Sequence, residues 1–229
     1  MLKIIFLCRR RPEITREQYA AFVLEGHAPL ALKHHPGLLR YVINIAEGPP
    51  PPGGPEIDSL PALYFASLED YEQRLYDSDE SREIIRRDVG RFMLGGADSY
   101  STTEYVQRKS ALRTAPIGQR SPGAKETWLL QRREGMSRQA FVDHWLHVHA
   151  PLALASRSDL AQYVASVVEA RLSETGERWD GIAELHFNSR AGEGEPGFSS
   201  NEARGRFEAD LAGFAGRSLV YRVAEWVQK

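Results

Sequence analysis

Apolar and polar residues follow the same order twice along the chain, and this order predicts two similar folding units. Apolar or alternating runs predict strands, whereas apolar residues spaced three and four apart predict helices. In the first half the predicted elements are a strand over 3–9, a helix after Thr15, strands over 38–45 and 62–67, a charged helix over 69–92 broken near 77–78, and a strand over 100–107. In the second half they are a strand over 126–132, a helix after Ser137, strands over 160–168 and 181–187, a helix over 201–214, and a strand over 219–227.

Each half therefore has the order β-α-β-β-α-β, which is typical of the ferredoxin-like fold. In that fold two helices cover one face of a four-stranded antiparallel sheet, and the other face needs a partner. The two sheets of this chain can cover each other. We therefore predict an α+β fold in which two ferredoxin-like repeats pack sheet to sheet as an intramolecular α+β barrel.

A repeated string of residues supports this duplication. The six residues that begin at His27 return, identical, at His149, which is an offset of 149 − 27 = 122 residues. A period of this length indicates complete folding units rather than the short repeats of a solenoid. We predict a first repeat over 1–107, a linker over 108–124 rich in proline and glycine, and a second repeat over 125–229.

Composition narrows the class of protein. The 229 residues include 29 basic and 31 acidic side chains, a net charge of −2 that suggests neither nucleic-acid nor membrane binding. The single Cys8 excludes a disulfide within the chain and fits a reducing compartment. No apolar run approaches the roughly 20 residues of a membrane span. We expect a cytoplasmic protein whose partner is a small-molecule substrate, and the sequence allows a monomer or a homodimer.

The second copy carries a recognisable motif. The run Phe141-x-x-x-Trp145-x-x-x-His149-Ala150-Pro151-Leu152 resembles the signature of the EthD-like family, of the dimeric α+β barrel superfamily. The first copy keeps the histidine but has Tyr19 and Val23 where the pattern has Phe and Trp. The resemblance implies chemistry found in that superfamily, which includes cofactor-free monooxygenases, polyketide cyclases, lactone isomerases, decarboxylases and haem-degrading enzymes. It also implies a non-catalytic alternative, since the name-giving members accompany an oxygenase system.

The repeated histidines are the candidate catalytic residues. Phe141, Trp145 and His149 share one helix stripe because they are spaced four residues apart. Pro151 removes a backbone donor, so we expect the helix to end or kink just after His149. An imidazole there could move a proton on a bound substrate, or it could hold the kink through a hydrogen bond. We choose His149 over its copy His27 because the second copy matches the motif better.

The candidate binding residues surround these histidines. We expect an apolar pocket against the helix in each half. The arginines at the end of each first strand could anchor a substrate carboxylate or pair with Asp88 and Asp210, and the sequence does not decide between these roles. We expect the two aspartates to satisfy backbone or arginine groups. The proposed binding residues are Trp145, Phe141, Tyr163, Phe187, His186, Tyr41, Tyr64, Arg132 and Arg10.

Metal and cofactor motifs are missing from the sequence. No His-x-x-x-His pair and no cysteine ligand accompanies the histidines, although His186 lies on a strand that we place beneath the helix. No P-loop, nucleophile elbow or dinucleotide fingerprint occurs. We therefore predict no metal and no cofactor.

These features lead to a functional hypothesis with two alternatives. The hypothesis is a cofactor-free lyase or isomerase that uses a histidine as general acid and base on an aromatic, lactone or polyketide-like small molecule. The alternatives are a cofactor-independent monooxygenase and a ligand-binding accessory protein of an oxidative degradation pathway.

Overall fold

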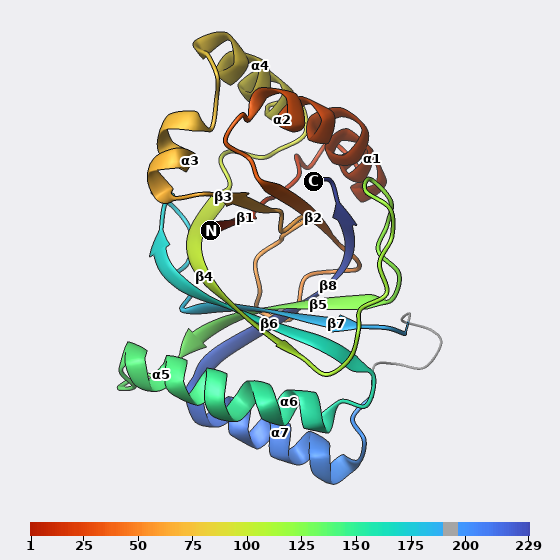
Figure 1. Ribbon diagram of the computed structural model, residues 1–229, viewed down its shortest axis with the longest axis vertical. Coiled ribbons are helices and arrows are strands. Elements are labelled where there is room, and N and C mark those ends of the chain that lie inside the picture. Colours follow the sequence, from red (N-terminus) through yellow and green to blue (C-terminus); the bar gives the residue numbers. More distant parts are fainter. Residues whose placement is uncertain (190–196) are drawn as a thin grey trace.

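The computed structural model describes residues 1–189 and 197–229, and its centre is a closed barrel of eight antiparallel strands (Figure 1). The helices lie outside the barrel in two layers, those of the first half on one side and those of the second half on the other. The strands are β1 Leu2–Leu7, β2 Arg40–Ala46, β3 Ala62–Phe65, β4 Asp98–Arg108, β5 Ala124–Arg132, β6 Leu160–Arg171, β7 Gly181–Phe187 and β8 Ala215–Val227. The α-helices are α1 Arg16–Ala21, α2 Ala28–His34, α3 Leu68–Arg74, α4 Asp79–Val89, α5 Arg138–His144, α6 Ala150–Ser156 and α7 Asn201–Phe214, with π-helical turns η1 Phe22–His27 and η2 Trp145–His149.

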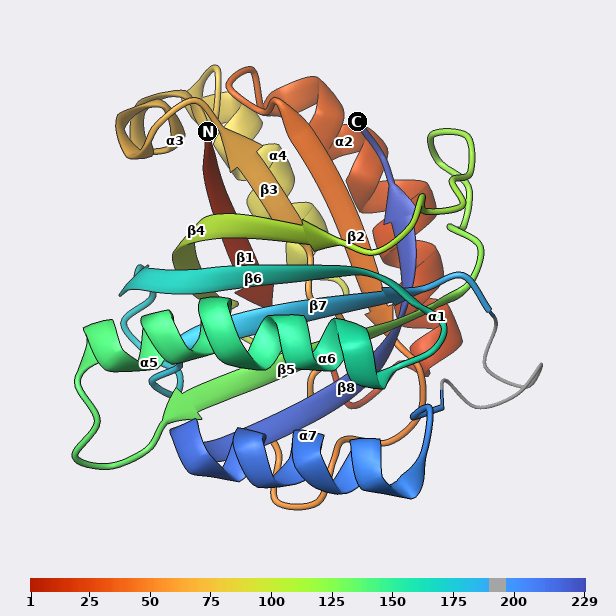
Figure 2. The same cartoon turned by 60° about the horizontal axis from the view of Figure 1, so that its bottom comes forward.

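Each half contributes four neighbouring strands to the barrel. Around the ring the order is β4-β1-β3-β2 from the first half and then β8-β5-β7-β6 from the second. The halves meet edge to edge, where β2 pairs with β8 and β4 pairs with β6. The predicted α+β barrel is found, but the predicted packing of two separate sheets face to face is not, because the edge strands of the two halves hydrogen-bond and close one barrel (Figure 2). Closure leaves no unpaired sheet edge.

The helices begin where the sequence predicts. The Thr15 hydroxyl accepts a hydrogen bond from the Gln18 amide, and the Gln18 side-chain oxygen accepts one from the Thr15 amide, which is a complete capping box. Ser137, Ser78 and Ser200 cap later helices through one bond each, which the serine hydroxyl accepts from the amide three residues on. The predicted break of the charged helix near 77–78 is confirmed, since α3 ends at Arg74 and α4 starts at Asp79.

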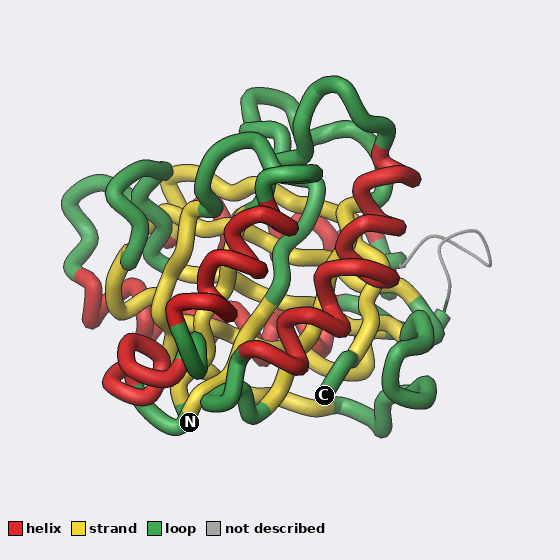
Figure 3. Tube along the Cα trace, turned by 90° about the horizontal axis from the view of Figure 1, so that it is seen from above, coloured by secondary structure: helices red, strands yellow, loops and turns green. Residues whose placement is uncertain are grey.

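We expected the helix to end or kink just after His149, and the first of these alternatives is wrong. The chain stays helical from Arg138 to Ser156, and a π-helical turn just before Pro151 lets the helix continue past the proline. In that turn the Ala150 amide donates to the carbonyl of Trp145, five residues earlier. Pro151 then lies in the first turn of α6, where a missing N–H costs little. The first half has the same turn, in which Ala28 donates to Val23, and Figure 3 shows the helices lying across the strands.

The interior of the barrel is apolar at one end and charged towards the other. Ile5, Leu129, Ile182 and Leu219 belong to the apolar part. Beyond them the Lys3 ammonium contacts both Glu104 and Glu184, and it also donates to Ser166. Breaking one partner of such a buried ion pair costs about 3–5 kcal/mol, because the other charge is left uncompensated. This ionic cluster therefore ties the first half to the second inside the barrel.

His186 faces this ionic cluster and should make stability depend on pH. Burial, followed by the charge of Lys125, lowers the pKa of His186 from 6.5 to about 4. The unfolded chain therefore binds a proton that the folded chain does not, and stability is lost as the pH falls from 6.5 to 4. The gap of 6.5 − 4 = 2.5 units corresponds to at most about 3 kcal/mol.

We expect His186→Gln to lose less stability than the wild type between pH 7 and pH 4 when both are unfolded in urea. His147→Gln, at an exposed histidine, is the matched control and should keep the wild-type slope. Equal slopes in all three proteins would contradict the buried, neutral state of His186.

Candidate functional site

A cavity of about 260 Å³ lies between the sheet and the helices of the first half. Its walls are mostly apolar, and they include side chains from the strands, from η1 and from α4. This volume lies near the lower limit of about 300–1,000 Å³ for small-molecule sites, which indicates a compact ligand. The lining of the cavity includes Cys8, Tyr19, Val23, His27, Tyr41, Ile85, Val89 and Phe92.

His27 stands at the wall of this cavity with one ring nitrogen engaged. Its Nδ1 lies 3.0 Å from the Oδ2 atom of Asp88. A carboxylate can only accept, so Nδ1 carries the proton and Nε2 is left as the basic nitrogen. Among the described residues Nε2 has no hydrogen-bond partner, and 16% of the side chain is exposed. The pair has the geometry of a general base whose orientation is held by a carboxylate.

Neutral polar groups line the other side of the cavity. The Tyr19 hydroxyl and the Ser59 hydroxyl lie 2.7 Å apart. Burial raises the pKa values of Tyr19 and Tyr41, and it raises the pKa of the Cys8 thiol to about 12. None of these groups is ionised at neutral pH, so Cys8 is not a thiolate nucleophile. The Tyr41 hydroxyl has no hydrogen-bond partner among the described residues and is available to a ligand.

His149 makes the equivalent bond but faces no comparable cavity. Its Nδ1 lies 2.8 Å from Asp210, whose other oxygen is 2.9 Å from Nε2 of His144. The rings of Phe207 and Phe214 pack against the imidazole at centroid distances of 4.8 and 4.9 Å. Burial lowers the pKa of His149, although its bond to Asp210 opposes the shift. The side chain is only 2% exposed, and the space beside it does not admit a water molecule.

The side chains at equivalent positions explain this difference between the halves. With the offset of 122 residues, Trp145 corresponds to Val23, since 145 − 23 = 122. Phe207 and Leu211 likewise correspond to Ile85 and Val89. The Trp145 ring is fully buried and its Nε1 donates to the Tyr163 hydroxyl at 2.9 Å. The larger side chains fill the space in the second half that remains open in the first.

Gly181 allows the Trp145 ring to occupy that space. A Cβ atom at residue 181 would lie 2.3 Å from Cζ3 of Trp145, which is far inside van der Waals contact. The Trp145 ring therefore packs directly against the sheet backbone at Gly181.

Several predicted binding residues belong to the core of the second half. Phe141, Trp145, Tyr163 and Phe187 are each at most 2% exposed and pack in one cluster. Tyr41 lines the cavity of the first half, whereas Tyr64 points into the barrel and donates to Glu104.

The strand of His186 lies beneath the helix as expected, but the His186 side chain does not join the pocket against that helix. Side chains alternate across a strand, so Phe187 faces the helices and His186 faces the barrel interior. His186 and His149 therefore lie on opposite faces of the sheet.

The two strand-end arginines form pairs that the sequence did not suggest. Arg10 Nε lies 3.2 Å from Asp58, and Arg132 Nη1 lies 2.8 Å from Asp180. The partners are themselves 180 − 58 = 122 residues apart. These ion pairs engage both arginines at equivalent places in the two halves.

The residues that sequence reasoning undervalued are Asp88 and Asp210. Both were expected to serve the backbone or an arginine. Asp88 does accept from Arg91 Nη1 at 3.5 Å, but each aspartate also bonds a repeated histidine. The signal was available, because aspartate and histidine recur together with the same offset.

Two kinds of site are not found within the described ranges. No group of three or more His, Cys, Asp or Glu side chains in residues 1–189 and 197–229 could hold a metal ion. Over the same ranges no helix has the length and hydropathy needed to span a membrane.

Comparison with protein families identifies the class of protein. The EthD domain model matches residues 11–96 and 133–218, so the chain belongs to the EthD domain family and contains two copies of the domain. Each match begins near the end of the first strand of its half and includes the histidine and aspartate described above.

Solved structures share the fold at low sequence identity. An anthrone oxidase-like protein is 13% identical, with a TM-score of 0.66, over 99% of this chain and 93% of its own. A provisionally assigned monooxygenase from Fusobacterium nucleatum is 7% identical, with a TM-score of 0.58, over 100% and 92% of the two chains. Another from Lactobacillus acidophilus NCFM is 10% identical, with a TM-score of 0.52, over 99% and 95%. Curated proteins give no match.

Exchanging the side chains at positions 23 and 145 tests the origin of the cavity. We expect Trp145→Val to lower the free energy of unfolding by about 3 kcal/mol, because it opens a void in a packed core. Val23→Trp combined with Ser59→Gly should fill the existing cavity, because Ser59 stands where the second half has Gly181 (181 − 59 = 122) and its Cβ would clash with the indole. Crystals under xenon pressure should then bind the gas beside Val23 in the wild type only. Xenon bound beside Trp at position 23 would contradict this explanation.

Proposed function

We propose that the protein is a cofactor-free enzyme that uses His27 as a general base on an aromatic or polyketide-like small molecule. The observation that supports this proposal is the His27–Asp88 pair at the wall of an apolar cavity, with Nε2 unpartnered among the described residues. The imidazole is the side chain best suited to proton transfer near neutral pH. His27 thus takes the role that the sequence motif favoured for His149.

The proposed reaction begins with transfer of a proton from a C–H or O–H group of the substrate to Nε2 of His27. Asp88 then stabilises the imidazolium through its hydrogen bond to Nδ1. The unpartnered Tyr41 hydroxyl could donate to the oxygen on which negative charge develops. The apolar walls strengthen both interactions because they exclude water.

The proton transfer leaves the substrate as an anion, which can react without oxygen or with it. Without oxygen, the anion reacts in one of two ways. If His27 returns the proton to another atom of the same molecule, or if the anion expels a leaving group, the enzyme is an isomerase or a lyase. This is the outcome that we favour, since the residues of the cavity supply acid–base groups and nothing more is required.

The second candidate is oxygenation of the same anion. A resonance-stabilised carbanion can take up O₂, and the hydroperoxide that forms can lose water to leave a ketone. The similarity in fold to an anthrone oxidase-like protein favours this candidate. An accessory protein that only binds the ligand would use the same cavity without proton transfer.

We further propose that the second half is mainly a scaffold. In this proposal Trp145, Phe141, Tyr163 and Phe187 hold the second half together rather than contact substrate. Arg10 and Arg132 fix the ends of the first strands through their aspartates and do not bind substrate. The proposed limits of the repeats are 1–107 and 125–229.

Exchange of deuterium from D₂O into the acidic methylene of an anthrone tests proton transfer at His27. Loss of a general base slows a reaction by about 10²–10⁴-fold. We therefore expect His27→Ala to slow the exchange at least 100-fold, with Asp88→Asn showing a smaller loss. An oxygen electrode in the same samples separates oxygenation, which consumes one O₂ per substrate, from isomerisation.

His149→Gln is the matched control, and it should keep exchange within a few fold of the wild-type rate. Catalysed exchange that survives in His27→Ala but is lost in the control would reject His27 as the base. Tight binding of the probe without exchange in the wild type would support the accessory protein instead.

A further inference from the structure

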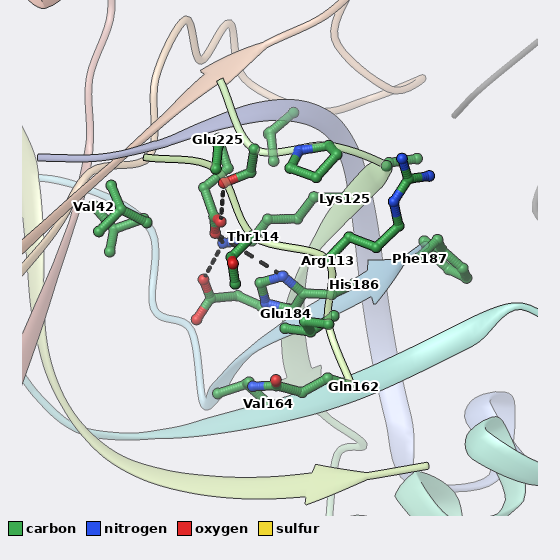
Figure 4. A pocket seen from close by; sticks show the side chains of 18 of the residues that line it. Val42, Arg113, Thr114, Lys125, Gln162, Val164, Glu184, His186, Phe187 and Glu225 are labelled. Carbon is green, nitrogen blue, oxygen red and sulfur yellow. Dashed lines mark hydrogen bonds and ion pairs between the residues drawn. The ribbon is translucent and has the colours of Figure 1, made fainter. Parts of the chain in front are cut away.

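A second cavity lies inside the barrel and is separate from the His27 site. It has a volume of about 500 Å³ and lies under the linker segment 111–123 at the charged end of the barrel (Figure 4). The sheet divides the two cavities, since Val42 faces the barrel interior and Tyr41 faces the helices. The volume falls within the range of about 300–1,000 Å³ for small-molecule sites.

The linker forms the roof of this cavity and is fixed in place. The Asn188 side chain accepts from the Arg113 amide at 3.1 Å and donates to the Ala111 carbonyl at 3.0 Å. Farther along, the amides of Gly118 and Ser121 donate to β8 at 2.8 and 2.7 Å. The cavity is therefore a built part of the fold.

Two polar side chains face the cavity, and one of them, Gln162, has a buried oxygen without a hydrogen-bond partner among the described residues. Gln162 is 8% exposed, and its Oε1 atom has no partner among the described residues. His186 pairs with it directly across strands β6 and β7, and its nearest ionic neighbour is Glu225, at 4.0 Å. Figure 4 shows both side chains on the wall of the cavity. A buried polar atom left unpaired costs about 1–3 kcal/mol, so Gln162 Oε1 is a candidate acceptor for a hydrogen bond from a ligand.

Carboxylates outnumber ammonium groups in the ionic cluster beside these side chains. The Lys125 ammonium lies 2.7 Å from Glu184 and 2.6 Å from Glu225, so it is shared by two carboxylates. The ionic cluster contains two lysines, Lys3 and Lys125, and three glutamates. Its net charge is therefore 2 − 3 = −1. A net negative wall beside an unpaired carbonyl oxygen suits a ligand group that donates hydrogen bonds and carries positive charge.

The mouth of the cavity has the opposite sign. Arg40 and Arg108 are exposed on its lining, and no carboxylate of the described residues lies within 4.0 Å of either. The Arg40 guanidinium stacks over the Tyr64 ring, 4.9 Å from its centroid. Guanidinium groups bind carboxylates well because the two shapes match.

We propose that the barrel cavity binds a small zwitterion that carries a primary ammonium and a carboxylate, such as a free amino acid. The ammonium donates to Gln162 Oε1 and lies near Glu225, and the carboxylate faces Arg40 and Arg108. The site is independent of the proposed reaction at His27, because the sheet lies between them.

Titration calorimetry of the full chain with each common amino acid tests this proposal. For the amino acid that binds best, the matched amine without the carboxylate and the matched acid without the ammonium should both bind at least tenfold more weakly. Gln162→Leu should raise the dissociation constant about tenfold, which corresponds to about 1.4 kcal/mol for one hydrogen bond. Arg108→Gln, an exposed change that spares the core, should weaken amino acids but not the amine.

Gln107→Leu provides the matched control. Gln107 lies on the adjacent strand β4 but donates to Leu146 at 2.8 Å on the helix side of the sheet, so binding should be unchanged. His27→Ala should also bind normally. The proposal is rejected if no amino acid binds, if Gln162→Leu binds like the wild type, or if the amine or the acid alone binds as tightly as the zwitterion.

Discussion

Every part of this molecule depends on the closure of the barrel. Strands β2 and β8 form one seam between the halves and strands β4 and β6 form the other, so neither sheet keeps a free edge. Inside, Lys3 of the first half contacts Glu184 of the second. A charge of this kind tolerates burial only while its partner is in place. The seams and the ionic cluster therefore hold the two halves in one fixed arrangement.

Closure allows the two helix layers to differ. In the second half Trp145, Phe207 and Leu211 fill the space beside His149, and the layer is a packed core. In the first half Val23, Ile85 and Val89 leave a cavity beside His27. Empty space in a core costs stability, and the closed barrel together with the packed half can offset that cost. In the function that we propose, one copy of the domain is a scaffold and the other carries the site.

The sequence predicts the fold well because its signals are local or repeated. Alternating residues placed the strands of both halves, and Thr15 and Ser137 marked the helix starts. The EthD resemblance, read from His149 and the aromatic residues before it, is confirmed over both halves. The helix through Pro151 escaped prediction, because a π-helical turn depends on how the neighbouring turns pack and not on the proline alone.

The site was harder to predict, because a cavity is the absence of side chains. The match of Trp145 to the motif pointed to the second half, yet the same indole ring fills the space that a ligand would need. In the first half, only the small size of Val23 and its neighbours indicated that a cavity would remain. The inward direction of His186 followed from strand alternation once β7 was placed, and the partners of Lys3 and Lys125 required the ring order of the strands.

Native-state hydrogen exchange in rising denaturant tests most directly whether closure holds the molecule together. Amides of β2, β4, β6 and β8 that bond across the seams should exchange only by global unfolding, with one common free energy for both halves. If the seam amides open at a much lower free energy, or if the first half unfolds while the second stays protected, the barrel is not the unit on which the rest depends.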